Sequence, residues 1–156
     1  MVDVGDKPVT RRRAVAEGRI RMRRETLQAI RDGEVPKGDV LAVARLAAIG
    51  GAKRTAETIP LCHPLPLDSV RVDVELEASD PGPGLRLVVE ATVEARTGVE
   101  MEALCGVSAG LLAVYDMCKA LDRGMEIGEV RLVAKEGGRG GPWRRSDRND
   151  AQETDR

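Results

Sequence analysis

The sequence has almost no aromatic residues, with one Tyr, one Trp and no Phe among 156 residues. Proteins that bind single-stranded nucleic acid stack bases on aromatic side chains, and Tyr115 and Trp143 are too few and too far apart for that. The net charge of −1 also lacks the positive excess typical of nucleic-acid-binding domains. We therefore expect no nucleic-acid partner, and a core built from aliphatic side chains.

Cysteine and histidine are scarce as well. Cys62, Cys105 and Cys118 have neither framework nor CxxC-type spacing, and His63 is the only histidine, so neither a disulfide framework nor a zinc site is expected. No secretory leader opens the sequence, which favours a reducing, cytoplasmic location. The longest apolar run, Ala103–Tyr115, is shorter than the roughly 18 residues of a membrane span, so no membrane segment is expected.

The length is typical of one domain, which we assign to residues 1–156, with segments 1–10 and 142–156 expected to be flexible. Residue alternation predicts strands, and helical spacing with Asp39 as an N-cap and Gly33 as a C-cap predicts helices. The expected order is strand 11–22, helix 24–32, helix 39–57, strand 69–77, turn 80–84, strand 85–96, helix 101–122 and strand 129–135. This order favours an α+β fold, a ferredoxin-like antiparallel sheet with helices packed on one face, although the connection order stays open.

The predicted helix 101–122 is apolar nearly all round. One stripe at helical spacing can pack on the sheet: Leu104, Val107, Leu111, Val114, Cys118 and Leu121. The opposite side is also largely apolar, and Gly106 and Gly110 would permit close approach of another backbone. Because a helix of this kind is usually covered on both sides, we expect a second copy of the chain to supply the other cover, and hence a homo-oligomer.

Asp116 stands nearly alone in this apolar setting. Burial would raise its pKa, whereas Lys119, three positions further on, would favour the ionised form. The pair could exchange a proton with a substrate, or it could be a simple ion pair at a helix end.

For three further segments the sequence does not decide between a binding role and a structural role. His63 lies in a stiff loop between prolines, where a linker with an incidental histidine is equally reasonable. Glu100, Met101 and Glu102 open the long helix, where the helix dipole alone favours carboxylates. The glycine-rich segment 135–141 combines flexibility with cations and could approach phosphate, although many such segments are merely mobile.

The sequence resembles the cyclic pyranopterin monophosphate synthase (MoaC) family of molybdenum cofactor biosynthesis. The resemblance covers about residues 1–141 and is carried by seven motifs in the family's order: Met1-Val-Asp-Val4, Lys37-Gly-Asp-Val40, Ala52-Lys-Arg-Thr55, Ile59-Pro-Leu-Cys-His-Pro64, Thr97-Gly-Val-Glu-Met-Glu-Ala103, Tyr115-Asp-Met-Cys-Lys-Ala120 and Val130-Arg-Leu-Val-Ala-Lys135.

The resemblance implies a ferredoxin-like subunit in a hexamer, a trimer of dimers with active sites at subunit interfaces. It implies conversion of 3′,8-cyclo-7,8-dihydroguanosine 5′-triphosphate into cyclic pyranopterin monophosphate and diphosphate. No cofactor is implied, and a Mg²⁺ ion carried by the triphosphate is compatible with the reaction. By motif position, Asp116 and Lys119 would be catalytic, and the residues that bind substrate would be Leu61, Cys62, His63, Glu100, Met101, Glu102, Lys37, Lys135 and Arg12.

Two residues depart from the family pattern. Glu136 stands where a small residue is usual, and Arg139 where a lysine is common. A negative charge at 136 leaves the role of the glycine-rich segment open. A non-catalytic nucleotide-binding module and a purely structural oligomer are the alternative interpretations of the same residues.

Overall fold

A computed structural model describes residues 1–79 and 82–146, so part of the expected turn 80–84 and residues 147–156 of the expected flexible tail lie outside the described residues. The elements follow the order β1 (Thr10–Arg21), α1 (Arg24–Asp32), α2 (Val40–Lys53), α3 (Thr55–Thr58), β2 (Ser69–Glu77), β3 (Gly84–Ala95), α4 (Glu100–Cys118), β4 (Glu126–Glu136) and β5 (Trp143–Arg144).

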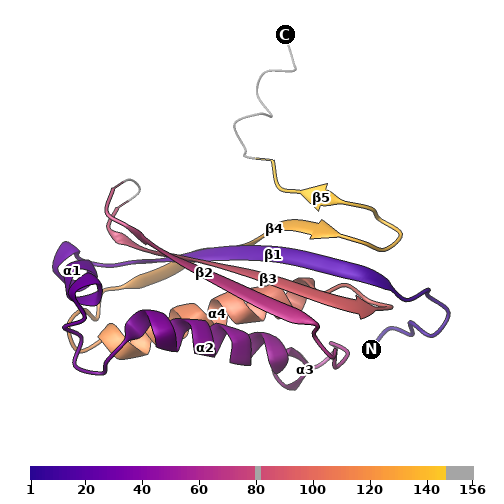
Figure 1. The fold of residues 1–156 in the computed structure, drawn as a ribbon, viewed down its shortest axis with the longest axis horizontal. Coiled ribbons are helices and arrows are strands. Elements are labelled where there is room, and N and C mark those ends of the chain that lie inside the picture. Colours follow the sequence, from indigo (N-terminus) through magenta and orange to yellow (C-terminus); the bar gives the residue numbers. More distant parts are fainter. Residues whose placement is uncertain (80–81, 147–156) are drawn as a thin grey trace, which may run out of the picture.

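The strands form one sheet in the order β2-β3-β1-β4-β5, with every neighbouring pair antiparallel. The helices α2 and α4 lie side by side on one face of this sheet (Figure 1). The prediction of an α+β fold with helices on one face is confirmed. The connection order, which the sequence left open, is the β-α-β-β-α-β path of a ferredoxin-like fold with β5 added at the edge.

The two predicted caps are confirmed. Gly33 ends α1 in the left-handed region, with φ of 72°. Its backbone N–H donates to the carbonyl oxygens of Ala29 and Ile30. The side chain of Asp39 accepts a hydrogen bond of 2.9 Å from the backbone N–H of Ala42 at the start of α2.

The prediction of one continuous helix from Asp39 to Glu57 is wrong. The backbone leaves the helical region at Arg54, with φ of −110° and ψ of 22°, and α3 is a separate turn of helix. Thr55 Oγ1 donates to the carbonyl oxygen of Ala52 at 3.0 Å. Such side-chain bonds compete with regular helical hydrogen bonding, which is the physical reason for the break.

The predicted bounds of β1 and β3 each differ by one residue from those observed, but two other elements differ more. β4 begins three residues early, because its pairing with β1 continues past an irregularity near Glu129, whose φ is 54°. α4 stops at Cys118, not at Asp122, because the N–H groups of Leu121 and Asp122 both turn back to the Cys118 carbonyl.

β5 falls within the segment that was expected to be flexible. Trp143 and Arg144 pair with Lys135 and Ala134 of β4 and extend the sheet by two residues. Two residues show no periodicity, so the sequence carried no signal for this strand.

The core lies between the sheet and the two long helices. In α4 the residues of the predicted stripe that fall within its middle, Val107, Leu111 and Val114, are fully buried. The opposite side of α4 does not need a second chain at Gly106 and Gly110, because α2 of the same chain packs there. A methyl group at Gly110 would lie 3.2 Å from the carbonyl oxygen of Ala44. The expectation that another copy covers these glycines is therefore wrong.

Small residues on both helices make this close approach feasible. The buried positions of α2 are Val40, Ala44, Ala48 and Ala52, whereas the larger Val43 and Leu46 point outward. Leu112 of α4 is likewise 61% exposed. The outer surface of the helix layer thus keeps apolar side chains that the single chain does not cover.

α4 is long and apolar enough, by length and composition, to cross a membrane, and half of its apolar window is buried inside the protein. The contacts of α4 with β1, β3, β4 and α2 identify it as a core helix of a soluble protein.

A buried carboxylate fastens the end of α4 to the start of α1. Asp122 Oδ2 accepts from the backbone N–H of Arg23 at 2.8 Å and from Thr26 Oγ1 at 3.4 Å, and Oδ1 accepts from the N–H of Gly124 at 3.0 Å. Burial opposes ionisation of Asp122, but these hydrogen bonds prevail and lower its pKa. No side chain at the start of α1 caps the N-terminus of that helix. Asp122, which is distant in the sequence, accepts the backbone hydrogen bond there instead.

The contact between α2 and α4 can be tested at two adjacent glycines. A methyl group at Gly51 would lie 2.5 Å from Ala109 Cβ and 2.9 Å from the Cys105 carbonyl oxygen, whereas at Gly50 it would meet only the end of the Arg54 side chain. We expect Gly51→Ala to lower the free energy of unfolding by about 1–3 kcal/mol. Gly50→Ala should raise it by about 0.5–1 kcal/mol, because alanine favours the helix. Urea unfolding of both variants measures the difference, and equal effects would argue against the close contact.

Candidate functional site

Three of the predicted site residues meet at the C-terminal end of α4 and form a cluster, here called the lysine–aspartate cluster. Lys119 Nζ lies 2.6 Å from Asp116 Oδ1, and Lys37 Nζ lies 2.6 Å from Asp116 Oδ2 and 2.9 Å from the Asp116 carbonyl oxygen. Lys37 lies in the loop between α1 and α2, whereas Asp122 binds the opposite end of α1, at Arg23 and Thr26. The sequence motif linked Asp116 to Lys119, but only the fold brings Lys37 to the same carboxylate.

The expectation that Asp116 is buried is wrong for the single chain, and of the two opposing influences on its pKa that the sequence suggested, that of Lys119 prevails. Its side chain is 57% exposed. Hydrogen bonds from Lys119 and Lys37 lower its pKa to about 2. The carboxylate is therefore ionised throughout the neutral range, and it is an acceptor flanked by two amines.

Six other predicted residues gather at the opposite end of α4. Leu61, Cys62 and His63 come from the loop after α3, and Glu100, Met101 and Glu102 from the first turn of the helix. All six line one pocket of about 420 Å³, here called the histidine pocket. The loop and the helix are far apart in the sequence, and the fold places them side by side.

Two groups of the histidine pocket have altered acidity. Burial raises the pKa of Glu102, with the neighbouring Glu100 adding to the effect. Burial also raises the pKa of the Cys62 thiol, and the nearby Glu102 and Cys105 act in the same direction. The pocket therefore favours a thiol over a thiolate at Cys62, and it favours proton uptake by Glu102. Among residues 1–79 and 82–146, no three His, Cys, Asp or Glu side chains are grouped in a way that could hold a metal ion.

The remaining predicted residues, Lys135 and Arg12, lie beside the histidine pocket. Lys135 Nζ is 3.1 Å from Glu100 Oε1, which links β4 to the start of α4. Arg12 lines an adjoining pocket of about 370 Å³, which shares Lys7, Thr97 and Gly98 with the histidine pocket. Eight of the eleven predicted residues are thus brought together at one end of the molecule.

The pocket around Arg12, here called the arginine pocket, brings two cations that sequence reasoning did not assign to a site, Lys7 and Arg96, next to Arg139 of the glycine-rich segment. Its lining includes Lys7, Arg96 and Arg139, and no carboxylate lines it among the described residues. The hydroxyl of Thr10, which also lines the pocket, is buried without a hydrogen-bond partner in the described part of the chain. Several cations and an unpartnered donor in one pocket suit a polyanionic ligand. The pairing of β1 with β3 and with β4 brings these residues together from distant parts of the sequence, and of the three cations only Arg139 lies in a segment that the sequence analysis had singled out.

The departure from the family pattern at Glu136 has a structural explanation. Glu136 Oε1 accepts a hydrogen bond of 3.0 Å from Arg13 Nη1, and Arg13 Nη2 lies 2.6 Å from Glu90 Oε2. The negative charge of Glu136 is thus paired with a neighbour on the adjacent strand. It does not leave an unbalanced carboxylate beside the glycine-rich segment.

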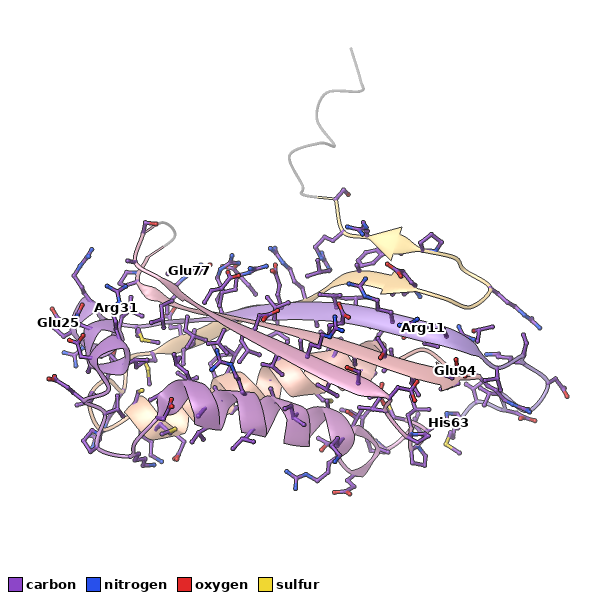
Figure 2. All side chains as sticks on the ribbon, viewed as in Figure 1. Arg11, Glu25, Arg31, His63, Glu77 and Glu94 are labelled. Carbon is purple, nitrogen blue, oxygen red and sulfur yellow. The ribbon has the colours of Figure 1, made fainter. Side chains whose placement is uncertain are left out.

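The two groups of predicted residues do not form one site within a single chain. Glu102 and Asp116 are separated by fourteen positions of α4, a distance of about 21 Å along the axis. Figure 2 shows His63 at one end of the molecule and α1, with labelled Glu25 and Arg31, at the other. The lysine–aspartate cluster lies at the α1 end, because Lys37 follows α1 directly.

The two-lysine arrangement predicts the titration of Asp116. Lys119→Ala should raise the pKa of Asp116 from about 2 towards its ordinary value of 3.8, and Lys37→Ala should do the same to a smaller extent. Carboxyl-carbon NMR titration of each variant measures the change, and Lys53→Ala, which alters an exposed lysine of α2, is the control. If the pKa of Asp116 is unchanged in both Lys119→Ala and Lys37→Ala, the result would contradict the geometry of the cluster.

Comparison with known proteins identifies the family of this chain. The chain matches the model of the MoaC family over residues 1–138. It is 59% identical over 149 residues to the cyclic pyranopterin monophosphate synthase of Thermomicrobium roseum, and the match covers 94% of this chain and 87% of that protein. The chain belongs to the MoaC family.

Proposed function

We propose that this protein converts 3′,8-cyclo-7,8-dihydroguanosine 5′-triphosphate into cyclic pyranopterin monophosphate and diphosphate. Its activity as a cyclic pyranopterin monophosphate synthase in molybdenum cofactor biosynthesis follows from its family and from the 59% identical relative. The residues that carry out the reaction are inferred from the geometry of the two ends of α4.

The observation that carries the assignment of the chemistry is the lysine–aspartate cluster. Asp116 is an ionised acceptor, and Lys119 and Lys37 are donors within 2.6 Å of it. Such a set can move protons to and from a substrate while the imidazole side of the purine is opened by water and rebuilt as a pterin. We assign Asp116 and Lys119 as catalytic and Lys37 as a substrate-binding residue that also orients Asp116.

The opposite end of α4 suits recognition of the nucleotide. The apolar Leu61 and Met101 and the polar His63 and Glu102 of the histidine pocket can enclose and hydrogen-bond a heterocycle. The adjoining arginine pocket can hold the triphosphate. Closure of the cyclic phosphate expels diphosphate, whose growing negative charge the nearby cations would stabilise.

A complete active site then requires two copies of the chain. The catalytic and binding groups are about 21 Å apart in one subunit, so a single substrate can reach both only if the ends of two different subunits meet. Leu112, one helical turn before Asp116, is 61% exposed, and Leu46 on the neighbouring helix is 70% exposed. A second copy that covers this apolar surface would also enclose Asp116 and Lys119. We therefore propose a homo-oligomer with active sites between subunits, and its form, a hexamer arranged as a trimer of dimers, is what the resemblance to the family implies.

A cytoplasmic location fits the proposed activity. The three cysteines are free thiols, which suits the reducing cytoplasm, and the nucleotide from which the substrate derives is a cytoplasmic metabolite. A Mg²⁺ ion bound to the triphosphate itself is compatible with the proposal.

The role of Asp116 can be tested directly. Asp116→Ala should lower turnover at least about 100-fold, the scale of a lost proton-transfer group. The cyclised triphosphate is the substrate, and diphosphate release is measured. Calorimetry with a GTP analogue should show little change in affinity. Asp32→Asn, which alters an exposed acid of α1, is the control, and unchanged turnover in Asp116→Ala would remove Asp116 from the mechanism.

The two-subunit site makes a separate prediction. Light scattering should give a hexamer of 16.8 kDa chains. We expect both Asp116→Ala and His63→Ala to be inactive. When the two variants are unfolded, mixed and refolded together, activity should partly return, because some sites receive intact residues from each parent. A monomeric mass, or mixed oligomers without activity, would contradict the proposal.

A further inference from the structure

Among the described residues, Arg12 and Arg11 are the arginines of β1 that form no ion pair, and of these two only Arg12 lines the arginine pocket. Arg13 and Arg19 each form ion pairs with two carboxylates. Arg12 instead donates to two backbone carbonyls, from Nε to Ala95 at 3.3 Å and from Nη2 to Arg96 at 3.4 Å. Within the described residues it has no carboxylate partner. Its guanidinium is thus oriented by neutral acceptors and keeps its full charge for a ligand.

The opposite side of this guanidinium lies against the backbone of Gly138. A methyl group at Gly138 would lie 1.8 Å from Arg12 Nη1 and 2.9 Å from Arg12 Cζ. These distances are much shorter than van der Waals contact. A side chain at position 138 would therefore clash with Arg12 in its present conformation. At the neighbouring Gly137 a methyl group would instead meet the Arg11 carbonyl oxygen at 2.2 Å, so its glycine is required by the strand backbone.

The glycine-rich segment could act in two ways. Its N–H groups could bind phosphate oxygens directly, as in phosphate-binding loops. Alternatively, its missing side chains could leave room for Arg12. Two observations favour the second role: the N–H of Gly141 is already used in a hydrogen bond to the Gly138 carbonyl at 3.2 Å, and the Arg12 head group occupies the space beside Gly138.

We propose that Gly138 is a positioning residue whose missing side chain lets Arg12 project into the arginine pocket and bind the phosphate groups of the substrate. The inference rests on the proposed function, because it takes the arginine pocket as the triphosphate site. It adds a specific role for the glycine-rich segment. This segment shapes the arrangement of Arg12 and does not itself coordinate phosphate.

Substitution of Gly138 should therefore act through Arg12. In Gly138→Ala the Arg12 guanidinium must move. It then loses its hydrogen bonds to the carbonyls of Ala95 and Arg96 and no longer points into the arginine pocket. The probe is diphosphate, and the measurement is its affinity by calorimetry with the full-length protein. We expect the affinity to fall by roughly tenfold or more, the scale of one lost charge-assisted hydrogen bond.

Gly141 provides a matched control in the same segment. Its φ of 65° resembles the 78° of Gly138, so alanine is similarly strained at both positions, but a methyl group at Gly141 would meet no atom within 4 Å. Gly141→Ala should therefore keep its affinity for diphosphate. Equal losses in Gly138→Ala and Gly141→Ala would show that backbone strain is responsible and would overturn the positioning role.

A double-mutant cycle with Arg12 separates this inference from the proposed function. Arg12→Ala should weaken diphosphate binding, and Gly138→Ala should then add no further loss in that background. If Arg12→Ala leaves binding unchanged, the assignment of the phosphate site fails. If Arg12→Ala weakens binding and the effect of Gly138→Ala simply adds to it, the positioning role fails while the phosphate site stands. Arg12→Lys combined with Gly138→Ala should recover part of the affinity, because lysine carries its charge without the Nη1 group.

Discussion

The packing of α4 against the sheet and against the neighbouring helix α2 is the contact on which the other features of this protein depend. One side of α4 buries Val107, Leu111 and Val114 on the sheet, and its glycines let the backbone of α2 approach to van der Waals contact. Apolar burial of this extent is the dominant favourable term in folding, and the close-packed interior leaves α4 little freedom to shift. Because α4 carries candidate site residues at both ends, this rigidity sets the distance between them.

The charged residues of the protein fall into two groups with different physical roles. On the sheet face away from the helices, charges neutralise one another: the nearly buried Glu17 lies 2.6 Å from Arg86 Nη2 and 2.7 Å from Arg131 Nη2. Removing one partner of such a network would leave a buried charge uncompensated. In the arginine pocket, by contrast, Arg12 is held by carbonyl oxygens, so its charge stays available. The net charge of −1 conceals this local excess of cations, which is what a polyphosphate requires.

Sequence reasoning recovered much of the fold but misjudged the surroundings of Asp116. The caps at Gly33 and Asp39 and the strand 69–77 were predicted correctly, because turn chemistry and residue alternation are local properties. Asp116 was expected to be buried because its neighbours along α4 are apolar. In the fold, α2 covers the glycine side of the helix, and Asp116 projects from the end of α4 towards Lys37, exposed and paired.

The sequence by itself determined the class of fold, the family and the identity of most candidate site residues, because periodicity and motifs record local chemistry. Only the tertiary structure decided that those residues divide between two distant ends of α4, that Lys37 joins Asp116, and that Gly138 lies against Arg12. Each of these depends on segments far apart in the chain that meet through strand register and helix packing. Contacts of that kind leave no local pattern in the sequence, since they arise only when the whole chain is folded.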